Sequence, residues 1–415
     1  MKILIISQYF WPENFRVNEL AEELVKLGHE VKILTGYPNY PKGEIYPEFI
    51  NFKSKFSNYK GSKIIRVPLI PRKNNKFYLL LNYVSFLFNS ILFGYFKLRK
   101  DNFDIIFTFQ LSPVTIGITS SFFSWIKKSP NIFWILDLWP DTLVALGIVH
   151  KNWQIKLLKY LVNWIYSNCE LILAQSKSIL KEVNNNYSSV KNRALYFPSW
   201  GESELFFRAK YPAPEVISKN VFTIIFAGNI GEAQDFPNII KAVQYLARKN
   251  ISGFRVIIIG GGSKKEWVKK EIKRLSIENY FEIYQNYPLE RMASFFLHAD
   301  ALLVSLSNQK VFNMTIPGKI QFYLSSGIPI IGMVSGEGGE VIKKSKSGYV
   351  CKSGDYKGLS RIISKMMKIE KSLLKEMGEN GRDYAKKEFS KTTLIKKLNK
   401  FFIKISNKKS NAKRS

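Results

Sequence analysis

The sequence has little cysteine and little acidic charge. Its 415 residues include 2 Cys, and these two residues, Cys169 and Cys351, lie far apart, each in or next to an expected strand. We therefore expect no disulfide framework, which suits a reducing compartment. Asp and Glu number 32 against 63 Lys and Arg, which gives a formal net charge of +31. Two explanations of this charge remain open: a compositional bias towards lysine, and attraction to an anionic surface.

Several ligand-binding motifs are also absent. The glycine loop Ile259–Ser263 does not match G-x-G-x-x-G with a later acidic residue, so a dinucleotide cofactor is disfavoured. The pattern G-x-x-x-x-G-K-[ST] does not occur, which argues against a nucleotide-hydrolysing P-loop. No helix-turn-helix, zinc-finger or RNA-binding motif is present, so a membrane is favoured over nucleic acid as the anionic partner.

What the sequence does contain is an alternation of short apolar runs with helical segments. Such runs predict parallel strands joined by helices, an α/β fold. We expect strands at 2–7, 30–35, 64–67, 104–108, 131–136, 171–174, 194–196, 222–227, 255–259, 281–284, 301–305, 328–334 and 349–351.

The length favours two domains. A proline-rich and polar stretch interrupts the alternation, so we expect a first domain at 1–197, a linker at 198–220 and a second domain at 221–390. The lysine-rich segment 391–415 is expected to be a basic helix or tail, solvated and frayed at its end.

One apolar segment, Phe77–Phe96, contains no charged residue and is flanked by Arg and Lys on both sides. It is long enough to span a membrane, which takes about 20 residues. However, Asn82, Ser85 and Asn89 form a polar stripe on such a helix, and the segment lies between expected strands. We therefore favour a helix lying in the membrane interface with its basic ends at the headgroups. A buried helix and a true span remain open, and Ser121–Lys128 could extend the same surface.

The stretch Thr315–Glu340 combines a turn, a short helix carrying Lys319, a glycine stop, an apolar strand and a glycine-rich loop that opens a further helix. This order brings two helix N-termini and a lysine to the carboxyl end of a strand. Such an arrangement suits a phosphate, because free N–H groups and the helix dipole favour an anion. An ordinary strand–helix unit is the alternative.

Taken together, five motifs resemble the bacterial glycosyltransferases of family 4, in particular the WbuB/WcaI-like branch of O-antigen, capsule and exopolysaccharide assembly. They are Ser7–Glu13 with Asn18–Ala21 and Leu27–Val31; Thr35–Gly43; Leu136–Asp141 with Ala145–Gly147; Gly228–Gln234; and Thr315–Glu340.

The resemblance implies the GT-B fold, two doubly wound Rossmann-like domains facing across a cleft. It also implies transfer of a sugar from a nucleotide-diphosphate donor in the second domain to an acceptor in the first, with retention and without a metal or other cofactor. The sequence contains no Asp-x-Asp pair. The donor-binding residues expected from the resemblance are Gly228, Asn229, Gly231, Gln234, Gly260, Gly261, Lys319, Glu337, Gly338, Gly339 and Glu340. The acceptor-binding residues are Arg16, Tyr37, Asn39, Asp137, Trp139 and Asp141.

The sequence departs from the family pattern at the donor site. Asn229 and Gln234-Asp235 stand where many relatives have Arg and Lys, and Met314 and Phe322 replace two carboxylates, the second of which binds the donor ribose. Gln321 or Gln309 are candidate substitutes. The residues expected to act in catalysis are Asp137, Lys319 and Glu340, although Asp137 could instead only cap the following turn.

The resulting hypothesis is a peripheral enzyme on the cytoplasmic face of an anionic membrane. It would transfer an N-acetylated amino sugar, such as N-acetyl-L-fucosamine, from a UDP-linked donor to a polyprenyl-diphosphate-linked oligosaccharide. Two alternatives are a UDP-N-acetylglucosamine 2-epimerase of the same fold and a non-catalytic basic binding protein. The apolar segment Phe77–Phe96 disfavours the first, and the second explains the charge alone.

Overall fold

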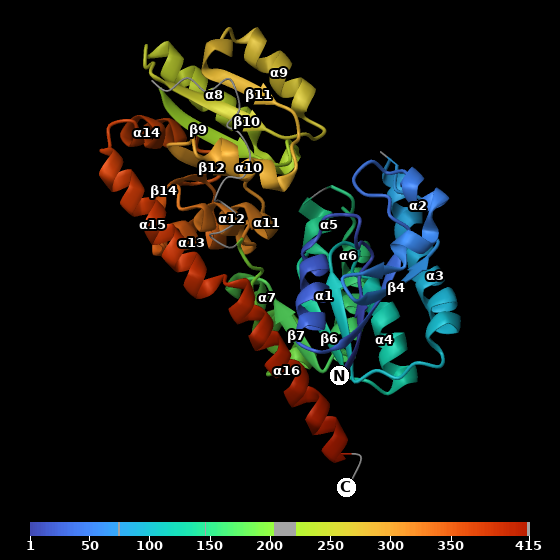
Figure 1. Ribbon diagram of the computed structural model, residues 1–415. Helices are drawn as coiled ribbons and strands as arrows, with labels where there is room; N and C mark the ends of the chain where they lie inside the picture. Colours follow the sequence, from blue (N-terminus) through green and yellow to red (C-terminus); the bar gives the residue numbers. More distant parts are fainter. Residues whose placement is uncertain (74, 146, 203–220, 413–415) are drawn as a thin grey trace. The chain divides into compact units, whose positions relative to one another are not determined.

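The computed structural model describes residues 1–73, 75–145, 147–202 and 221–412. The chain forms two compact units, Met1–Phe197 together with Ile395–Ser415, and Pro198–Leu394 (Figure 1). The chain therefore passes into the second unit after Phe197 and returns to the first at Ile395. Most of the expected linker, 203–220, lies outside the described residues.

The first unit is built on an eight-stranded sheet in the order β3-β4-β2-β1-β5-β6-β7-β8. Its strands pair in parallel except for the antiparallel pair β3 and β4. The strands are β1 Lys2–Ile6, β2 Glu30–Gly36, β3 Asn58–Tyr59, β4 Ser62–Val67, β5 Ile105–Gln110, β6 Asn131–Ile135, β7 Leu171–Ala174 and β8 Ala194–Tyr196.

Helices cover both faces of this sheet. Because crossovers between parallel strands are right-handed, the strand order places α1 on one face and α3, α4 and α6 on the other. The helical segments are α1 Arg16–Lys26, α2 Pro47–Asn51, η1 Lys53–Phe56, α3 Lys76–Leu98, α4 Ile116–Lys127, α5 Asp141–Ala145, α6 Asn152–Ser167, α7 Lys177–Asn186 and η2 Ser188–Val190. Neighbours α3 and α4 pack together, as do α4 and α6.

The C-terminal helix α16, Lys391–Ala412, corrects one expectation. We expected a solvated, frayed end, but Leu394, Ile395, Leu398 and Phe402 are buried. The Phe402 ring lies 5.6 Å from that of Phe107 in β5. Ile395, Leu398 and Phe402 recur at helical spacing between lysines, so this stripe of the helix packs within the first unit while the lysines remain outside.

The second unit contains a six-stranded parallel sheet in the order β11-β10-β9-β12-β13-β14. Its strands are β9 Phe222–Ala227, β10 Phe254–Ile259, β11 Phe281–Tyr284, β12 Ala301–Ser305, β13 Ile330–Met333 and β14 Gly348–Cys351. Its helical segments are η4 Glu232–Gln234, α8 Phe236–Arg248, α9 Lys265–Arg274, η5 Glu278–Tyr280, α10 Leu289–Phe296, α11 Lys310–Met314, α12 Gly318–Ser326, α13 Gly336–Lys344, α14 Tyr356–Met366 and α15 Lys371–Glu388.

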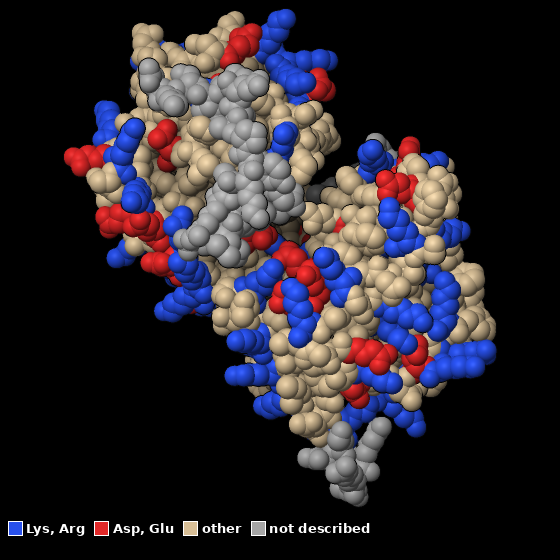
Figure 2. All heavy atoms as spheres, in the orientation of Figure 1, with Lys and Arg blue, Asp and Glu red and all other residues tan. Residues whose placement is uncertain are grey.

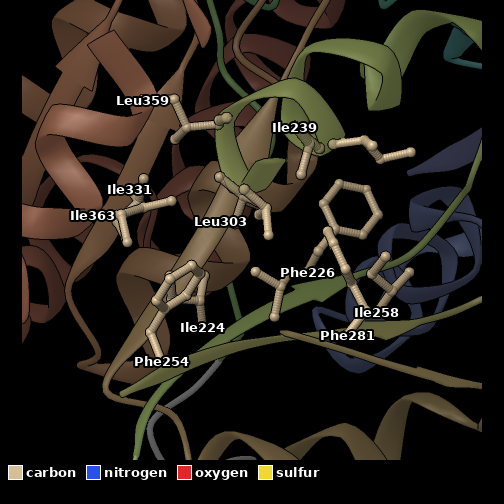
Figure 3. Packing of buried hydrophobic residues seen from close by; sticks show 14 of the residues in the cluster. Ile224, Phe226, Ile239, Phe254, Ile258, Phe281, Leu303, Ile331, Leu359 and Ile363 are labelled. Atoms are coloured by element: carbon tan, nitrogen blue, oxygen red, sulfur yellow. The ribbon is translucent and has the colours of Figure 1, made fainter. Parts of the chain in front are cut away.

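An apolar layer lies on each face of this second sheet. Figure 3 shows Phe226 and Leu303 of the sheet packed with Ile239 of α8 and with Leu359 and Ile363 of α14. Burial on both faces favours strands that are apolar at most positions, and this explains why the apolar runs predicted them. The expected strands are present, with ends within two residues of the expectation.

The basic residues are not gathered in a single patch. On the face shown in Figure 2, Lys and Arg side chains are spread widely over both units, with acidic side chains among them. A general lysine bias accounts for such a distribution, so any specific anionic partner has to be argued from local groups of residues.

Candidate active site

The donor site expected from the sequence lies at the carboxyl edge of the second sheet. There β9 is followed by Gly228, whose N–H donates to the carbonyl of Ile259 at the end of β10 (2.8 Å). Gly228 has a φ of +120°, a backbone conformation that L side chains rarely adopt. An added Cβ would also lie 2.8 Å from Cε of Lys319. Gly228 thus leaves room for the lysine side chain.

Lys319 lies in the first turn of α12, and its amine is buried. Its Nζ has no hydrogen-bond partner among the described residues and lies 3.5 Å from the centroid of the Phe226 ring. Burial lowers the pKa of this amine to about 7. The ring face compensates only part of the lost hydration of an ammonium group. An anion beside Gly228 would supply the missing acceptor.

The glycine-rich loop brings the start of α13 against the start of α12. A Cβ at Gly338 would lie 3.0 Å from Cδ1 of Ile320 and 3.1 Å from Cδ of Pro317, so only glycine fits comfortably. The N-cap residue Ser335 does not cap its own helix, because its hydroxyl accepts from the N–H of Ser353 (3.0 Å). The first turn of α13 therefore lacks a side-chain cap, and two uncapped helix starts adjoin.

The remaining acidic residues of this loop differ in exposure. Glu337 is half-buried, and its charge contributes to a raised pKa of Tyr384 after the larger effects of burial and Glu388. Glu340 is exposed and pairs with Lys343 (3.3 Å), as is common on a solvated helix face. Gly339 is buried against the carbonyl of Val334.

The neutral residues that replace the family's cations bind one another. Oε1 of Gln234 accepts from Nδ2 of Asn229 (3.2 Å) and from the N–H of Gly231 (3.1 Å). The carbonyl of Gln234 accepts from the hydroxyl of Ser305 at the end of β12 (2.6 Å). This segment is thus held in place without contributing positive charge, and Lys319 is the buried cation at this edge.

The two glycines after β10 take part in the same edge. Gly260 is buried, and its carbonyl accepts from Nζ of Lys265 (3.0 Å), while the carbonyl of Gly261 accepts from the N–H of Ile230 (2.8 Å). Both carbonyls are therefore already engaged within the protein.

The structure also shows what occupies the positions of the missing carboxylates. Met314 and Phe322 are each only 8% exposed, and Phe322 packs in the apolar layer on one face of the sheet. Gln321 cannot substitute there as expected, because its Nε2 donates to the carbonyl of Ser199 (3.0 Å) and its side chain is buried. It sits one position from Phe322 on α12 and therefore points to another side of the helix. Gln309 is exposed at the start of α11.

In the first unit, Asp137 follows β6 and is half-buried. Its two oxygens accept from the hydroxyls of Thr142 in α5 (2.6 Å) and Ser112 after β5. Ser112 in turn accepts from Nε1 of Trp139 (3.0 Å). Asp137 and Trp139 are thus brought into one network, whereas Asp141 lies in the first turn of α5. The network joins the carboxyl ends of β5 and β6, where ligands of such sheets bind.

A buried carboxylate that sequence reasoning missed shapes the other acceptor-side motif. Glu13 is 1% exposed, and its Oε1 accepts from the N–H groups of Asn39 (2.8 Å) and Tyr40 (2.7 Å). Its Oε2 accepts from the N–H of Phe10 (3.2 Å). Burial raises the pKa of Glu13 to about 7, although these N–H groups oppose the shift. An acidic residue inside an otherwise apolar motif was the available signal.

The expected acceptor residues near Glu13 have mainly internal contacts. Asn39 is fully buried, and its Nδ2 donates to the carbonyl of Tyr37 (3.0 Å). The ring of Tyr37 lies 4.8 Å from that of Phe49. Arg16 pairs with Glu19 on α1 (2.7 Å). Asn39 and Tyr37 therefore form a shaped loop, and Arg16 lies on the helix that follows the first strand.

Unpaired polar atoms mark the same edge of the first sheet. Gln8 Oε1, the Tyr9 hydroxyl and Gln110 Oε1 are buried without a hydrogen-bond partner among the described residues. They belong to the carboxyl ends of the neighbouring strands β1 and β5. Tyr83 of α3 lies nearby, with a pKa raised to about 12 chiefly by burial and in part by the Asp137 charge. Buried atoms of this kind normally find partners, so they are candidate contacts for sugar hydroxyls.

Helix α3 turns its polar residues towards the protein and its apolar residues towards the outside. Its polar stripe faces the protein: Nδ2 of Asn82 donates to the carbonyl of Ile70 (2.6 Å), and Nδ2 of Asn89 donates to that of Pro68 (2.9 Å). Its outward face is apolar and consists of the exposed residues Phe77, Leu80, Val84, Phe88, Leu92, Phe93, Tyr95 and Phe96. The exposed face means that α3 is not an ordinary core helix.

Exposed aromatic and apolar residues also occur on α4 and α6, and α3 itself has the length of a membrane-crossing helix. On α6, the exposed residues Trp153, Leu157, Tyr160 and Trp164 form a stripe at helical spacing, and Trp125 of α4 is 78% exposed. In the described part of the chain, one helix, Phe77–Leu98, is long and apolar enough to cross a membrane, and 22% of its most apolar window is buried. Sequence reasoning identified the α3 and α4 segments but missed α6.

In the described part of the chain, residues that could hold a metal ion are not clustered. Among residues 1–73, 75–145, 147–202 and 221–412, no group of three or more His, Cys, Asp or Glu side chains has a suitable arrangement.

Comparisons with known proteins cover both units. The model described as Glycosyltransferase Family 4 matches residues 14–195, and the model described as Glycosyl transferases group 1 matches residues 207–384. A probable glycosyltransferase, WbjE of Pseudomonas aeruginosa, is 25% identical over 319 residues, 73% of this chain and 76% of that protein. The putative colanic acid biosynthesis glycosyl transferase WcaI of Escherichia coli is 23% identical, over 70% and 72% of the two chains.

The fold is shared with a solved structure of lower sequence identity. The crystal structure of HepE from Anabaena in complex with UDP and glucose superposes with a TM-score of 0.68 at 12% identity, over 97% of this chain and 100% of that one.

Proposed function

Because the chain belongs to glycosyltransferase family 4 and has the GT-B fold, we propose that it transfers a sugar from a UDP-linked donor to a lipid-linked acceptor in surface polysaccharide assembly. The complex of HepE with UDP and glucose supports a UDP-linked donor, and the name of WcaI supports a role in polysaccharide assembly. The proposed donor sugar is an N-acetylated amino sugar such as N-acetyl-L-fucosamine, and the proposed acceptor is a polyprenyl-diphosphate-linked oligosaccharide.

The observation that carries this proposal is the buried, unpaired amine of Lys319 beneath Gly228. When the glycosidic bond breaks, its electron pair stays on the departing diphosphate oxygen, where negative charge develops. An ammonium group fixed beside that oxygen stabilises the charge without having to reorganise. The uncapped starts of α12 and α13 add free N–H donors, and the positive potential at these helix N-termini also favours the negative charge of the diphosphate.

In this reaction the acceptor hydroxyl forms the new bond to the anomeric carbon and loses its proton, and the UDP oxygen leaves. We propose retention of the anomeric configuration, with the departing phosphate oxygen taking the proton. Asp137 then positions the acceptor, because its oxygens are already oriented by Ser112 and Thr142 yet keep lone pairs for a further hydroxyl. The unpaired atoms of Gln8, Tyr9 and Gln110 are the proposed contacts of the acceptor sugar.

A lipid-linked acceptor is consistent with the apolar outward face of α3. We propose that this face lies in the interface of the cytoplasmic leaflet, so that the protein is peripheral and α3 does not span the bilayer. The inward polar stripe supports this orientation, because Asn82 also accepts from Nε2 of Gln8 (2.6 Å) and ties α3 to the edge of the sheet. A spanning helix would have to break these bonds.

The test is to incubate the purified protein with membranes that contain the acceptor lipid and with a panel of radiolabelled nucleotide sugars. We expect label in the lipid fraction with one UDP-linked amino sugar and none with the Lys319→Met variant. Isomerised free nucleotide sugar without labelled lipid would instead identify an epimerase. Neither product from any donor, with binding to acidic polymer, would favour a non-catalytic binding protein.

A further inference from the structure

A groove of about 590 Å³ lies at the end of the first unit opposite to the candidate acceptor edge. It is lined by Tyr95 and Arg99 at the end of α3, by Lys127 and Lys128 at the end of α4, by Asp104 before β5 and by Lys409 of α16. Asp104 and Lys128 precede β5 and β6, so the groove adjoins the amino edge of the sheet. None of these residues belongs to the proposed catalytic machinery.

The groove carries an excess of positive charge. Arg99 and Lys128 are exposed and have no acceptor among the described residues. Lys127 is fixed, because its Nζ donates to the carbonyls of Leu98 (2.7 Å) and Arg99 (2.9 Å) at the end of α3. The single carboxylate of the lining, Asp104, accepts from the N–H of Lys2 (2.7 Å). Among the residues that the structure describes, these two cations therefore have no partner at the groove.

Apolar side chains border the groove on the side of α3 and α4. Tyr95 lines the groove, and the exposed residues Phe96 and Trp125 lie three positions before Arg99 on α3 and before Lys128 at the end of α4. Tyr95 and Phe96 also belong to the apolar outward face of α3. A headgroup with attached acyl chains presents the matching combination, a phosphate next to hydrocarbon. Trp and Tyr are also favoured at the level of lipid headgroups.

From this combination we propose that the groove binds the phosphate of an anionic phospholipid headgroup, with Arg99 and Lys128 as its principal ligands. The phosphate of the acceptor is a poor candidate, because α3 rises by about 1.5 Å per residue and separates Arg99 from Tyr83 by about 24 Å along the helix. The site would fix the orientation of α3 on the membrane surface. This inference rests on the membrane contact of the proposed function but does not require sugar transfer.

The experiment uses dihexanoyl phosphatidylglycerol below its critical micelle concentration, so that no bilayer contributes to binding. Calorimetric titration of the full-length protein should give saturable binding of one lipid per chain. The Arg99→Gln/Lys128→Gln variant should bind at least ten-fold more weakly. The control variant Lys63→Gln/Lys100→Gln removes the same charge at exposed positions outside the groove and should stay within two-fold of the wild type.

Two further ligands distinguish the source of the phosphate. Dihexanoyl phosphatidylcholine should not bind, and inorganic phosphate at the same concentration should not displace phosphatidylglycerol. Displacement by inorganic phosphate would overturn the lipid assignment, and equal losses in the two double variants would show diffuse charge attraction in place of a site. Circular dichroism of both variants checks that the fold is kept. Lipid binding without sugar transfer would refute the proposed function alone, whereas transfer without saturable lipid binding would refute this site alone.

Discussion

The amine of Lys319 lies 3.5 Å from the centroid of the Phe226 ring and has no hydrogen-bond partner among the described residues. An ion in this position has lost most of its hydration, and a ring face replaces only part of that loss. The position therefore costs stability in the free protein unless an anion is bound. Strain of this kind at an otherwise well-packed edge is typical of a binding residue.

The first prediction concerns Lys319→Met, which keeps the length of the side chain and removes the charge. We expect donor-dependent transfer to fall at least 100-fold, since a removed electrostatic group of this kind typically accounts for about 3 kcal/mol of transition-state stabilisation. The folded protein should be as stable as the wild type or more so at pH 7. Turnover near the wild-type value would contradict the role of Lys319 at the diphosphate.

The second prediction concerns protons. Burial lowers the pKa of Lys319 to about 7. At pH 8.5, about one and a half pH units above this pKa, the amine of the free protein is therefore mostly neutral. A bound diphosphate favours the ammonium form, and UDP binding at this pH should therefore take up a proton. Calorimetric titration with UDP in two buffers of different ionisation enthalpy measures this uptake. The uptake should be absent in Lys319→Met.

The same shift has a consequence for stability. The unfolded chain binds its lysine proton up to the ordinary pKa of 10.5, above the value in the folded state. Between about pH 7 and 10.5 the unfolded state thus binds more protons, and the contribution of Lys319 to stability rises with pH. Any stability advantage of Lys319→Met should accordingly shrink between pH 7 and 10.

The third prediction tests the space beneath Gly228. In Gly228→Ala, the methyl group would approach Cε of Lys319, and the φ of +120° would be strained by roughly 1–2 kcal/mol. We expect a lower Tm and weaker UDP binding, because the lysine must move. Gly318→Ala is the matched control, since an added Cβ there meets nothing within 4 Å. Equal UDP affinity in both variants would show that Lys319 does not depend on this glycine.

The fourth prediction concerns Glu13. Glu13→Gln places an NH2 group opposite at least one backbone N–H from which the carboxyl group now accepts a hydrogen bond, at a cost of about 1–3 kcal/mol. Urea unfolding at pH 5 should show this loss, and limited proteolysis should show a loosened Tyr37–Tyr40 loop. The exposed residue Glu48 of α2 provides the control Glu48→Gln, for which we expect no change.

The pH dependence of that loss follows from the raised pKa. The carboxyl of the folded protein keeps its proton up to about pH 7, whereas the ordinary value is 4.5. The folded state therefore binds more protons between these values, and the wild type loses stability as the pH rises through them. The difference between wild type and Glu13→Gln should become smaller from pH 5 to pH 8. A difference that grows would mean that the N–H groups outweigh burial at this site.

The sequence predicted the strands well because both sheets are buried on both faces, so most positions of the central strands are apolar. The place of Lys319 was also predictable, since it follows a turn at a helix start before a buried strand. The sequence could not show the hydrogen-bond partners of buried polar side chains, because these partners lie far away in the chain. Gln321 was read as open to a ligand, but its partner Ser199 lies 122 positions away. Glu13 likewise acts on a loop 26 positions later, and no local pattern reveals that.

The direction of the α3 stripe illustrates the same limit. The spacing of Asn82, Ser85 and Asn89 predicts that the three residues share one side of the helix, but it does not say what that side contacts. The partners are the carbonyl groups of Pro68 and Ile70, in a segment that leaves β4 without a strand to bond to. Those carbonyls need donors, and the stripe supplies them. Because the polar stripe has to face these carbonyls, the apolar face of α3 lies on the outside.

The last prediction concerns that outward face. Phe88 and Leu92 of α3 are 67% and 53% exposed, and their transfer into the bilayer interface contributes up to about 1.5–3 kcal/mol for each side chain. Phe88→Ser/Leu92→Ser should therefore reduce flotation with vesicles of uncharged phosphatidylcholine by at least ten-fold while leaving the fold intact. Uncharged vesicles are used because they separate this effect from the basic groove. Trp267→Ser/Leu297→Ser removes comparable exposed side chains from the second unit and should float as the wild type does. If both double variants float equally well, the face of α3 does not meet lipid, and a partner protein has to be sought for it.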